Sequence, residues 1–436
     1  MLTTNIRYKT QDAKSTKTGY SLVIPIILST LILATNPFSY SHTIPALSDS
    51  SKELYLLRSE HYLYITSSEN TSSVSLSFAY PPVYSYQSPI FFELYNDTTA
   101  PVQSYKIIND TYPNLLVNFN IGPLHKNDMF LIHFSFYVLI KNHEFNDIPL
   151  YVKFPVMKDI PDDALPWLKN SSVVQVNNPL INMKAKQIRS KNNNLISYAK
   201  DVAYFIKHNR YPLFVLQLKT GLFFSQDAVT TLLINGENVG RSHLACALFR
   251  NQGIPARVVL AHNDQGFWTQ MHYMVEYYIP RYGWVLLDST KGETPYPTRR
   301  QIINRICSIN DEENTKYDYI HKFMKGEERW LWINTSCVRP YYLDCREGSS
   351  RSQMFTEQTI ISNPDDVEFA FQLTKQVFRR YQMYLGMNLT PVNQMIFNHA
   401  LTLQRESLDN LILNGNLDLY IKGLIDAYNE YNQITI

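Results

Sequence analysis

The chain has few cysteines, few glycines and almost no net charge. Only four of its 436 residues are cysteine and 14 are glycine, and the formal net charge is +2. No Cys-x-x-Cys pair and no cluster of cysteine with histidine occurs, so the sequence does not support a zinc site. No dense run of lysine and arginine with interleaved aromatic residues occurs either, which argues against a nucleic-acid-binding surface. We therefore expect no metal, no organic cofactor and no nucleic acid partner.

Long apolar runs are also scarce. The one strongly apolar run extends from Ser21 to Thr35, and three lysines precede it. Fifteen residues are few for a membrane span and suit the core of a secretory signal. No cysteine follows closely, so we do not expect a bacterial lipoprotein anchor. We expect export to the cell envelope or the medium, with residues 1–45 as a cleaved signal or a retained membrane anchor; a buried strand or helix is the alternative.

The four cysteines are spread over the second half of the sequence. Cys337 and Cys345 are spaced closely enough to form a disulfide bridge in an exported protein. Cys246 falls within a predicted helix, where a buried thiol behaves as a small apolar side chain.

Residues 50–158 contain several short runs of β-branched and aromatic residues, separated by Asn, Asp, Pro and Ser. The clearest runs are residues 54–57, 62–65, 74–78, 115–119, 130–134 and 151–154. Several of them alternate apolar with polar residues, a pattern typical of strands with one buried face. With 31 tyrosines against 14 glycines, the composition also suits β-rich packing. This part of the sequence predicts an antiparallel β-sandwich.

A Pro-, Asn- and Ser-rich stretch, residues 159–178, reads as a linker, and helical periodicity begins after it. Apolar residues recur at intervals of three and four in residues 179–188 and 193–208. The same periodicity returns in residues 365–385 and 390–431, within a helical C-terminal region that we place at residues 357–436. No repeat of fixed period occurs. A second domain, at residues 165–345, lies between the sandwich and this region.

The most informative stretch is residues 238–257, NVGRSHLACALFRNQGIPAR. It predicts an amphipathic helix over residues 239–252, ended by Gly253-Ile254-Pro255 according to the usual preference for glycine and then proline. Downstream, His272 lies in an alternating strand and Asp288 ends another apolar strand. A residue at a helix start, an imidazole and a carboxylate on neighbouring strands form the layout of a nucleophile, a base and the group that orients the base.

This pattern resembles the transglutaminase-like superfamily. In that family a catalytic cysteine starts the helix, the sequence GIPAR follows it, and a histidine, a Gly-Trp pair and an aspartate come next. Here the matching residues are 253–257, His272, Trp284 and Asp288, and the likeness extends over about residues 167–290. The C-terminal helices lie outside it.

With the strand and helix patterns described above, we expect an α+β protein with an N-terminal antiparallel β-sandwich and a C-terminal helical extension. The resemblance implies a central papain-like transglutaminase core between them. It also implies acyl chemistry at amide bonds, with His272 as the base and Asp288 as the carboxylate that fixes its tautomer. Glu276 reproduces the His-x-x-x-Glu spacing of the family. The resemblance implies no cofactor.

One position departs from the family. Counting back from the glycine turn, the residue at the nucleophile position is Asn238. An amide has no ionisable proton near neutral pH and is a poor nucleophile, so the thioester mechanism cannot start there. Ser242 lies one helical turn, about 6 Å, further along the axis. Cys246 lies two turns away, and no other cysteine occurs between Thr220 and Cys246.

Several functions remain open from the sequence. The first is a catalytically silent protein that binds a peptide or protein in the retained cleft, with aromatics such as Phe267 and Trp268 lining the groove. The second is an active acyltransferase, peptidase or amidase, in which Asn238 polarises a carbonyl and His272, oriented by Asp288, activates water or another nucleophile. A purely structural spacer is the third. If Asn238 were an introduced substitution, the natural protein would have an ordinary cysteine.

Overall fold

The computed structural model describes residues 51–209, 225–234, 236–263, 270–316, 330–340 and 351–435. All of them belong to one compact unit, Leu47–Ile436. The apolar run that ends at Thr35 lies outside the described residues, as do Phe267, Trp268 and Cys345. The predicted Cys337–Cys345 bridge and groove therefore stay predictions. Within the described ranges, no helix is both long and apolar enough to cross a membrane.

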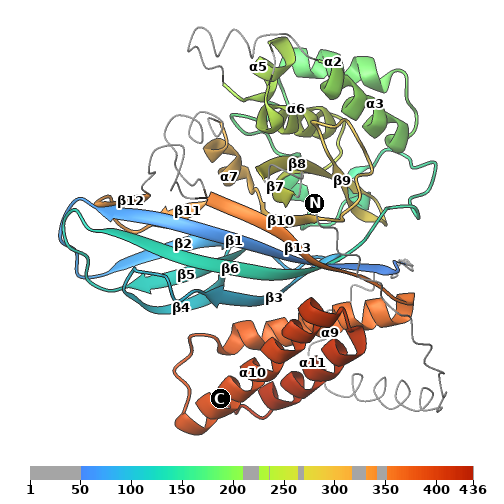
Figure 1. The fold of residues 1–436 in the computed structure, drawn as a ribbon. Helices are drawn as coiled ribbons and strands as arrows, with labels where there is room; N and C mark the ends of the chain where they lie inside the picture. The colour runs from blue at the N-terminus through green and yellow to red at the C-terminus, as the bar shows by residue number, and fades with distance from the viewer. Residues whose placement is uncertain are drawn as a thin grey trace, which may run out of the picture. The chain divides into compact units, whose positions relative to one another are not determined.

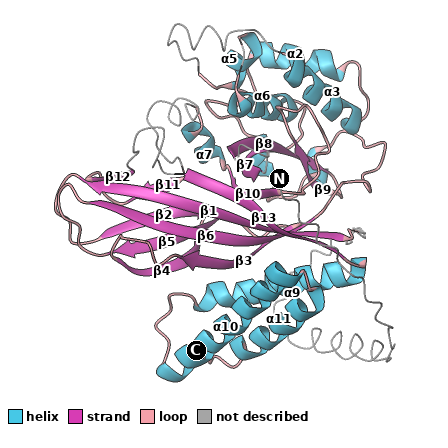
Figure 2. Cartoon of the chain, viewed as in Figure 1, coloured by secondary structure: helices cyan, strands magenta, loops and turns pink. Residues whose placement is uncertain are grey.

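Two antiparallel sheets form the sandwich (Figure 2). In the first, the order is β12–β1–β6–β3, and β13 also pairs with β1; the strands are β1 (Glu53–Ser67), β3 (Gln87–Leu94), β6 (Met129–Lys141), β12 (Val338–Pro340) and β13 (Arg351–Ile361). In the second, the order is β11–β2–β5–β4; the strands are β2 (Val74–Tyr80), β4 (Val102–Asn109), β5 (Leu115–Ile121) and β11 (Leu331–Ile333). Along β5 the side chains of Leu115, Val117, Phe119 and Ile121 are buried and those between them are not, because successive residues of a strand point to opposite faces. The predicted antiparallel sandwich is present.

Some of the individual strand predictions differ from the structure. The runs 54–57 and 62–65 are parts of one long strand, β1, and β3 and β4 were not predicted. The predicted strand at 151–154 is wrong, because its backbone bonds to the start of a helix instead of to a strand. Val152 donates its N–H to the side chain of Asn194 at 3.0 Å and accepts one from Leu195 at 2.8 Å.

The sandwich is built from two distant stretches of the chain. Strands β11, β12 and β13 lie within residues 331–361, which the predicted boundaries divide between the second domain and the C-terminal region. In the structure β13 pairs with β1 along its whole length, from Glu53 opposite Ile361 to Tyr62 opposite Arg351. The sandwich therefore extends beyond residues 50–158.

The central domain contains a four-stranded antiparallel sheet in the order β10–β7–β8–β9. Its strands are β7 (Ala256–Asn263), β8 (Gln270–Ile279), β9 (Gly283–Leu287) and β10 (Gln301–Ile306). Its helices are α2 (Pro179–Arg189), α3 (Leu195–His208), α5 (Ala228–Leu233), α6 (Asn238–Asn251) and α7 (Ile309–Asn314), with short 3-10 turns at η1 (Met157–Asp159) and η2 (Leu165–Leu168). Figure 1 shows α6 lying against β7 and β8. The predicted helices at 179–188, 193–208 and 239–252 are confirmed within two residues.

Two expectations about this domain are wrong. The helix α6 is not amphipathic, since its residues from Val239 to Arg250 are buried apart from Arg241. The sheet covers one side of it and α2, α3 and α5 cover the others. The stretch 159–178 is not a free linker either, because Trp167 and Val174, among others, are buried in the core of the central domain.

The C-terminal region is helical, as the sequence predicts, and its described residues form three helices. They are α9 (Pro364–Tyr384), α10 (Pro391–Asn414) and α11 (Leu417–Tyr431). The side chain of Asn363 caps α9 by accepting the backbone N–H of Asp366 at 2.9 Å. Helix α9 shares the sandwich core, where the rings of Phe378 and Tyr80 stack with centroids 6.0 Å apart.

The sandwich closes the outer edge of the central sheet through two side-chain amides. Gln87 accepts the backbone N–H of Ile303 at 2.8 Å and donates to its carbonyl at 2.9 Å. Asn114 makes the same pair of bonds with Ile306, both at 2.8 Å. Each amide thus replaces a neighbouring strand along β10, whose backbone groups would otherwise be buried without partners.

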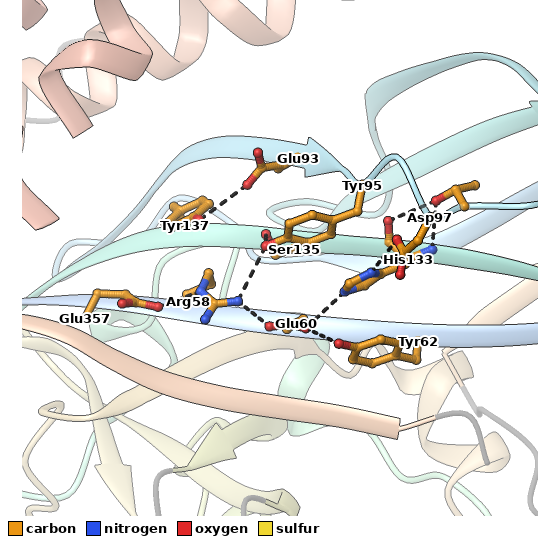
Figure 3. A network of polar contacts seen from close by, with 11 residues as sticks. Arg58, Glu60, Tyr62, Glu93, Tyr95, Asp97, His133, Ser135, Tyr137 and Glu357 are labelled. Carbon is orange, nitrogen blue, oxygen red and sulfur yellow. Dashed lines mark hydrogen bonds and ion pairs between the residues drawn. The ribbon is translucent and has the colours of Figure 1, made fainter. Parts of the chain in front are cut away.

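One face of the first sandwich sheet carries a network of polar side chains, shown in Figure 3. His133 stacks between the rings of Tyr62 and Tyr95, with centroids 4.0 and 4.1 Å away. One ring nitrogen lies 2.7 Å from Asp97 and the other 3.0 Å from Glu60. Contacts of this kind tie β1, β6 and the turn after β3 together.

Candidate functional site

The start of α6 is held tightly against the preceding helix. Asn238 is the first residue of α6, and Glu237 precedes it without a side-chain cap. Instead, the backbone N–H of Glu237 donates to the side-chain oxygen of Gln226 at 2.9 Å. A Cβ atom at Gly240 would lie 2.5 Å from the hydroxyl of Thr231, so only glycine permits this close approach. Asn238 is therefore in a fixed position, partly exposed at the helix start.

The structure brings the three predicted site residues together. His272 lies near the start of β8, and its Nδ1 is 3.3 Å from the amide nitrogen of Asn238. Its Nε2 is 3.2 Å from Oδ1 of Asp288, which follows the end of β9. The imidazole is 5% exposed and the carboxylate is fully buried.

The carboxylate of Asp288 is held in place from two sides. Its Oδ1 accepts the backbone N–H groups of Thr290 and Lys291, each at 2.9 Å. Burial alone raises the pKa of this carboxyl, but the contact with His272 and the two backbone donors bring the pKa below its ordinary value. Asp288 therefore remains ionised near neutral pH, which suits a group that orients an imidazole.

The contact with Asn238 is compatible with one tautomer of a neutral His272 imidazole. An Asn238 amide N–H directed at Nδ1 requires a lone pair on that nitrogen, so the ring proton of a neutral imidazole lies on Nε2. Nε2 lies 3.2 Å from Oδ1 of Asp288, close enough for an ion pair but without the geometry of a hydrogen bond. A histidine that removes a proton through Nδ1 needs this same tautomer. In this protein the group next to Nδ1 is the amide of Asn238, whereas the family has a cysteine thiol at the matching position.

Neither of the two alternative nucleophiles reaches His272. The hydroxyl of Ser242 is fully buried and lies within hydrogen-bonding distance of the carbonyls of Asn238 and Tyr273, at 2.9 and 3.2 Å, and of the Ser289 hydroxyl, at 3.0 Å. Cys246 is also fully buried, and burial raises the pKa of its thiol far above its ordinary range. Both residues pack the interior of α6.

The His-x-x-x-Glu spacing has a structural explanation, because Glu276 takes part in a buried ion pair. Arg257 and Glu276 face each other in register on β7 and β8, and both Nε and Nη2 of the guanidinium lie 2.7 Å from the carboxylate. The guanidinium also lies 3.8 Å from the ring centre of Trp284. The sequence did not reveal the other partners of Glu276, Tyr84 and Tyr86, because they lie about 190 residues earlier, in the sandwich.

The histidine inside α6 is part of the core. His243 is fully buried, its Nδ1 contacts the carbonyl of Gln226, and its Nε2 lies 2.7 Å from the hydroxyl of Thr315. Burial lowers the pKa of His243, so the ring stays neutral. Within the described part of the chain, no group of three or more His, Cys, Asp or Glu side chains is arranged to hold a metal ion.

Comparison with known proteins agrees with this geometry. Residues 182–289, which include Asn238, His272 and Asp288, match the model of the transglutaminase-like superfamily. A solved structure from Cytophaga hutchinsonii, of a protein thought to be a cysteine protease, is similar with a TM-score of 0.50 and 15% sequence identity. The match covers 71% of this chain and 93% of that one. The curated proteins gave no significant match. Residues 182–289 are therefore a transglutaminase-like, papain-like domain, set between antiparallel strands and C-terminal helices.

Proposed function

We propose that the transglutaminase-like domain is catalytically silent and uses its cleft to bind a peptide or protein. The observation that carries the proposal is the contact between the Asn238 amide and Nδ1 of His272. His272 lies between this amide and the carboxylate of Asp288, and the family resemblance assigns the thiol position to Asn238.

Silence follows from the chemistry of these groups. The lone pair of an amide nitrogen is delocalised into the carbonyl, and the N–H has no acidity near neutral pH, so Asn238 does not attack an acyl carbon. Ser242 and Cys246 are buried. A water molecule would have to displace the amide from Nδ1 of His272 before the imidazole could activate it.

Binding is supported by the polar groups at the start of α6. The side chain of Asn238 is partly exposed there, and it has both a donor and an acceptor. The first backbone N–H groups of a helix lack partners within the helix, and they favour carbonyl or carboxylate groups of a ligand. Peptide groups offer the matching carbonyls and N–H donors. Export, which we propose from the apolar run at residues 21–35, would put this cleft in the envelope or outside the cell.

The test compares turnover by the native chain and by Asn238→Cys. Both are assayed for transfer of a glutamine amide to a primary amine and for cleavage of a peptide library, with Asn238→Cys/His272→Ala as the matched control. We expect no turnover by the native chain or the double variant, and measurable turnover by Asn238→Cys. Turnover by the native chain that is lost in His272→Ala would show an active enzyme and refute the proposal.

Binding is tested separately with the native chain and a peptide array. We expect retained peptides whose binding weakens in Asn238→Ala, with the melting temperature unchanged. If no peptide binds, or if Asn238→Ala binds equally well, the cleft is not the binding site and a scaffold role becomes the better account.

A further inference from the structure

We infer that Tyr84 and Tyr86, two residues of the sandwich, are positioning residues for His272. They act through Glu276, which lies on the same strand as His272. The inference rests on the site geometry used in the proposed function and extends it to a second domain. The sandwich, through these tyrosines, keeps the imidazole of His272 in place.

His272 and Glu276 share one face of β8. They are four residues apart, and side chains of a strand alternate between its faces with a period of two. Glu276 is fully buried and pairs with Arg257 on the adjacent strand. Any change in the position of the Glu276 carboxylate therefore acts on the strand that holds the imidazole.

The two tyrosines complete the hydrogen bonds of this carboxylate. Tyr86 donates its hydroxyl to Oε1 of Glu276 at 3.1 Å, the oxygen that the guanidinium of Arg257 leaves open. Tyr84 donates to Oε2 at 3.3 Å. Burial, and then the nearby carboxylate, raises the pKa of both tyrosines well above its ordinary value, so both stay donors at any working pH.

A buried ion pair holds a defined geometry only when its remaining lone pairs also have partners. Without the tyrosine hydroxyls, Oε1 of the Glu276 carboxylate would have no hydrogen-bond donor. The carboxylate would then rotate toward a different donor. The strand would shift with it, and reacting groups lose efficiency steeply when their separation changes by about 1 Å. The expected consequence is a longer and more variable distance from His272 to position 238.

The same connection between β2 and β3 provides a matched control. Gln87 follows Tyr86 directly, and its side-chain amide bonds to Ile303 on β10, at the far side of β7 from β8, and to the carbonyl of Pro82 at 2.9 Å. Loss of the Gln87 amide weakens the contact between the sandwich and the central sheet without removing a partner of Glu276. Comparing Gln87→Ala with the tyrosine variants therefore separates a general weakening of the contact between the sandwich and the central sheet from a specific effect on β8.

The experiment uses the full-length chain with Asn238→Cys, in which the rate of alkylation by iodoacetamide is measured as a function of pH. An imidazolium close to a cysteine favours the thiolate, so the midpoint of reactivity reports the distance between the two groups. Adding Tyr84→Phe and Tyr86→Phe should raise this midpoint and slow alkylation at neutral pH by about tenfold. Adding Gln87→Ala should lower the melting temperature but leave the pH profile unchanged.

A second measurement keeps the inference testable in the native chain. The imidazole resonances of His272, assigned by their loss in His272→Ala, are followed by NMR in a pH titration. We expect the double tyrosine variant, but not Gln87→Ala, to shift the resonances and the titration midpoint. Unchanged profiles in both measurements would overturn the inference. If Asn238→Cys alone reacts like an ordinary cysteine, the site geometry on which the proposed function rests fails, and the NMR titration still decides the role of the tyrosines.

Discussion

The amide nitrogen of Asn238 lies 3.3 Å from Nδ1 of His272. On its other side the imidazole lies 3.2 Å from the carboxylate of Asp288. His272 therefore lies between Asp288 and an amide side chain that cannot attack an acyl carbon.

The charge of Asp288 should matter both for the site and for stability in acid. Its pKa is lowered in the folded chain, so it stabilises the fold at pH values above the unfolded pKa of about 3.9. That stabilisation is lost as the pH falls through the folded value. We expect Asp288→Asn to lower the free energy of unfolding near neutral pH and to flatten its acid dependence. Urea unfolding at a series of pH values measures this; an unchanged acid slope would contradict it.

The buried histidine His61 should make the protein sensitive to mild acid. Burial, and then the neighbouring His262, lowers the pKa of His61 well below its ordinary value. The folded chain keeps this ring neutral while the unfolded chain binds a proton below about pH 6.5, so stability falls as the pH drops through that value. The melting temperature should fall between pH 8 and pH 5, and less so in His61→Phe. The exposed His125→Gln is the control and should behave like the native chain.

The ion pair between Arg250 and Glu312 should be costly to break. Both side chains are fully buried, and Arg250 also donates to the carbonyl of Ala256 at 2.8 Å. Arg250→Ala leaves the carboxylate without its charged partner, and we expect a loss of about 3–5 kcal/mol in the free energy of unfolding. The double variant Arg250→Met/Glu312→Leu should lose less than Arg250→Ala alone. A decrease of less than about 1 kcal/mol in the free energy of unfolding of Arg250→Ala would show that water reaches the ion pair.

The amide of Asn114 should contribute to the stability of the whole unit. Asn114→Ala removes both hydrogen bonds to Ile306 and leaves two buried backbone groups without partners, at a cost of about 1–3 kcal/mol. Asn120→Ala, an exposed position on β5, the strand that begins directly after Asn114, serves as the control. Denaturant unfolding followed by fluorescence measures both. Equal stability of the two variants would mean that β10 finds other partners.

The sequence was sufficient for the parts of the fold that depend on local periodicity. The helices at residues 179–188 and 365–385 could be predicted because apolar residues recur along them at helical intervals. The surroundings of α6 could not, since its burial depends on three helices and a sheet that pack around it. The run at 151–154 has the composition of a strand, and only the distant Asn194 explains why it is not one.

Some residues of the candidate site could likewise be predicted from the sequence, and others could not. His272 and Asp288 could be identified because their spacing resembles a family pattern, and Asn238 because it departs from that pattern. The partners Tyr84 and Tyr86 leave no signal in the sequence, because their contact with Glu276 joins two domains. Hydrogen bonds across such distances depend on tertiary packing, which no local pattern records.

The central claim is that only the nucleophile is missing from an otherwise intact site. The most direct test is the rate of iodoacetamide alkylation of Asn238→Cys at neutral pH, compared with the same variant in the His272→Ala background. The account predicts fast, His272-dependent labelling at position 238, with the buried Cys246 unlabelled in both. Labelling at the rate of an ordinary exposed cysteine, unchanged by loss of His272, would contradict it.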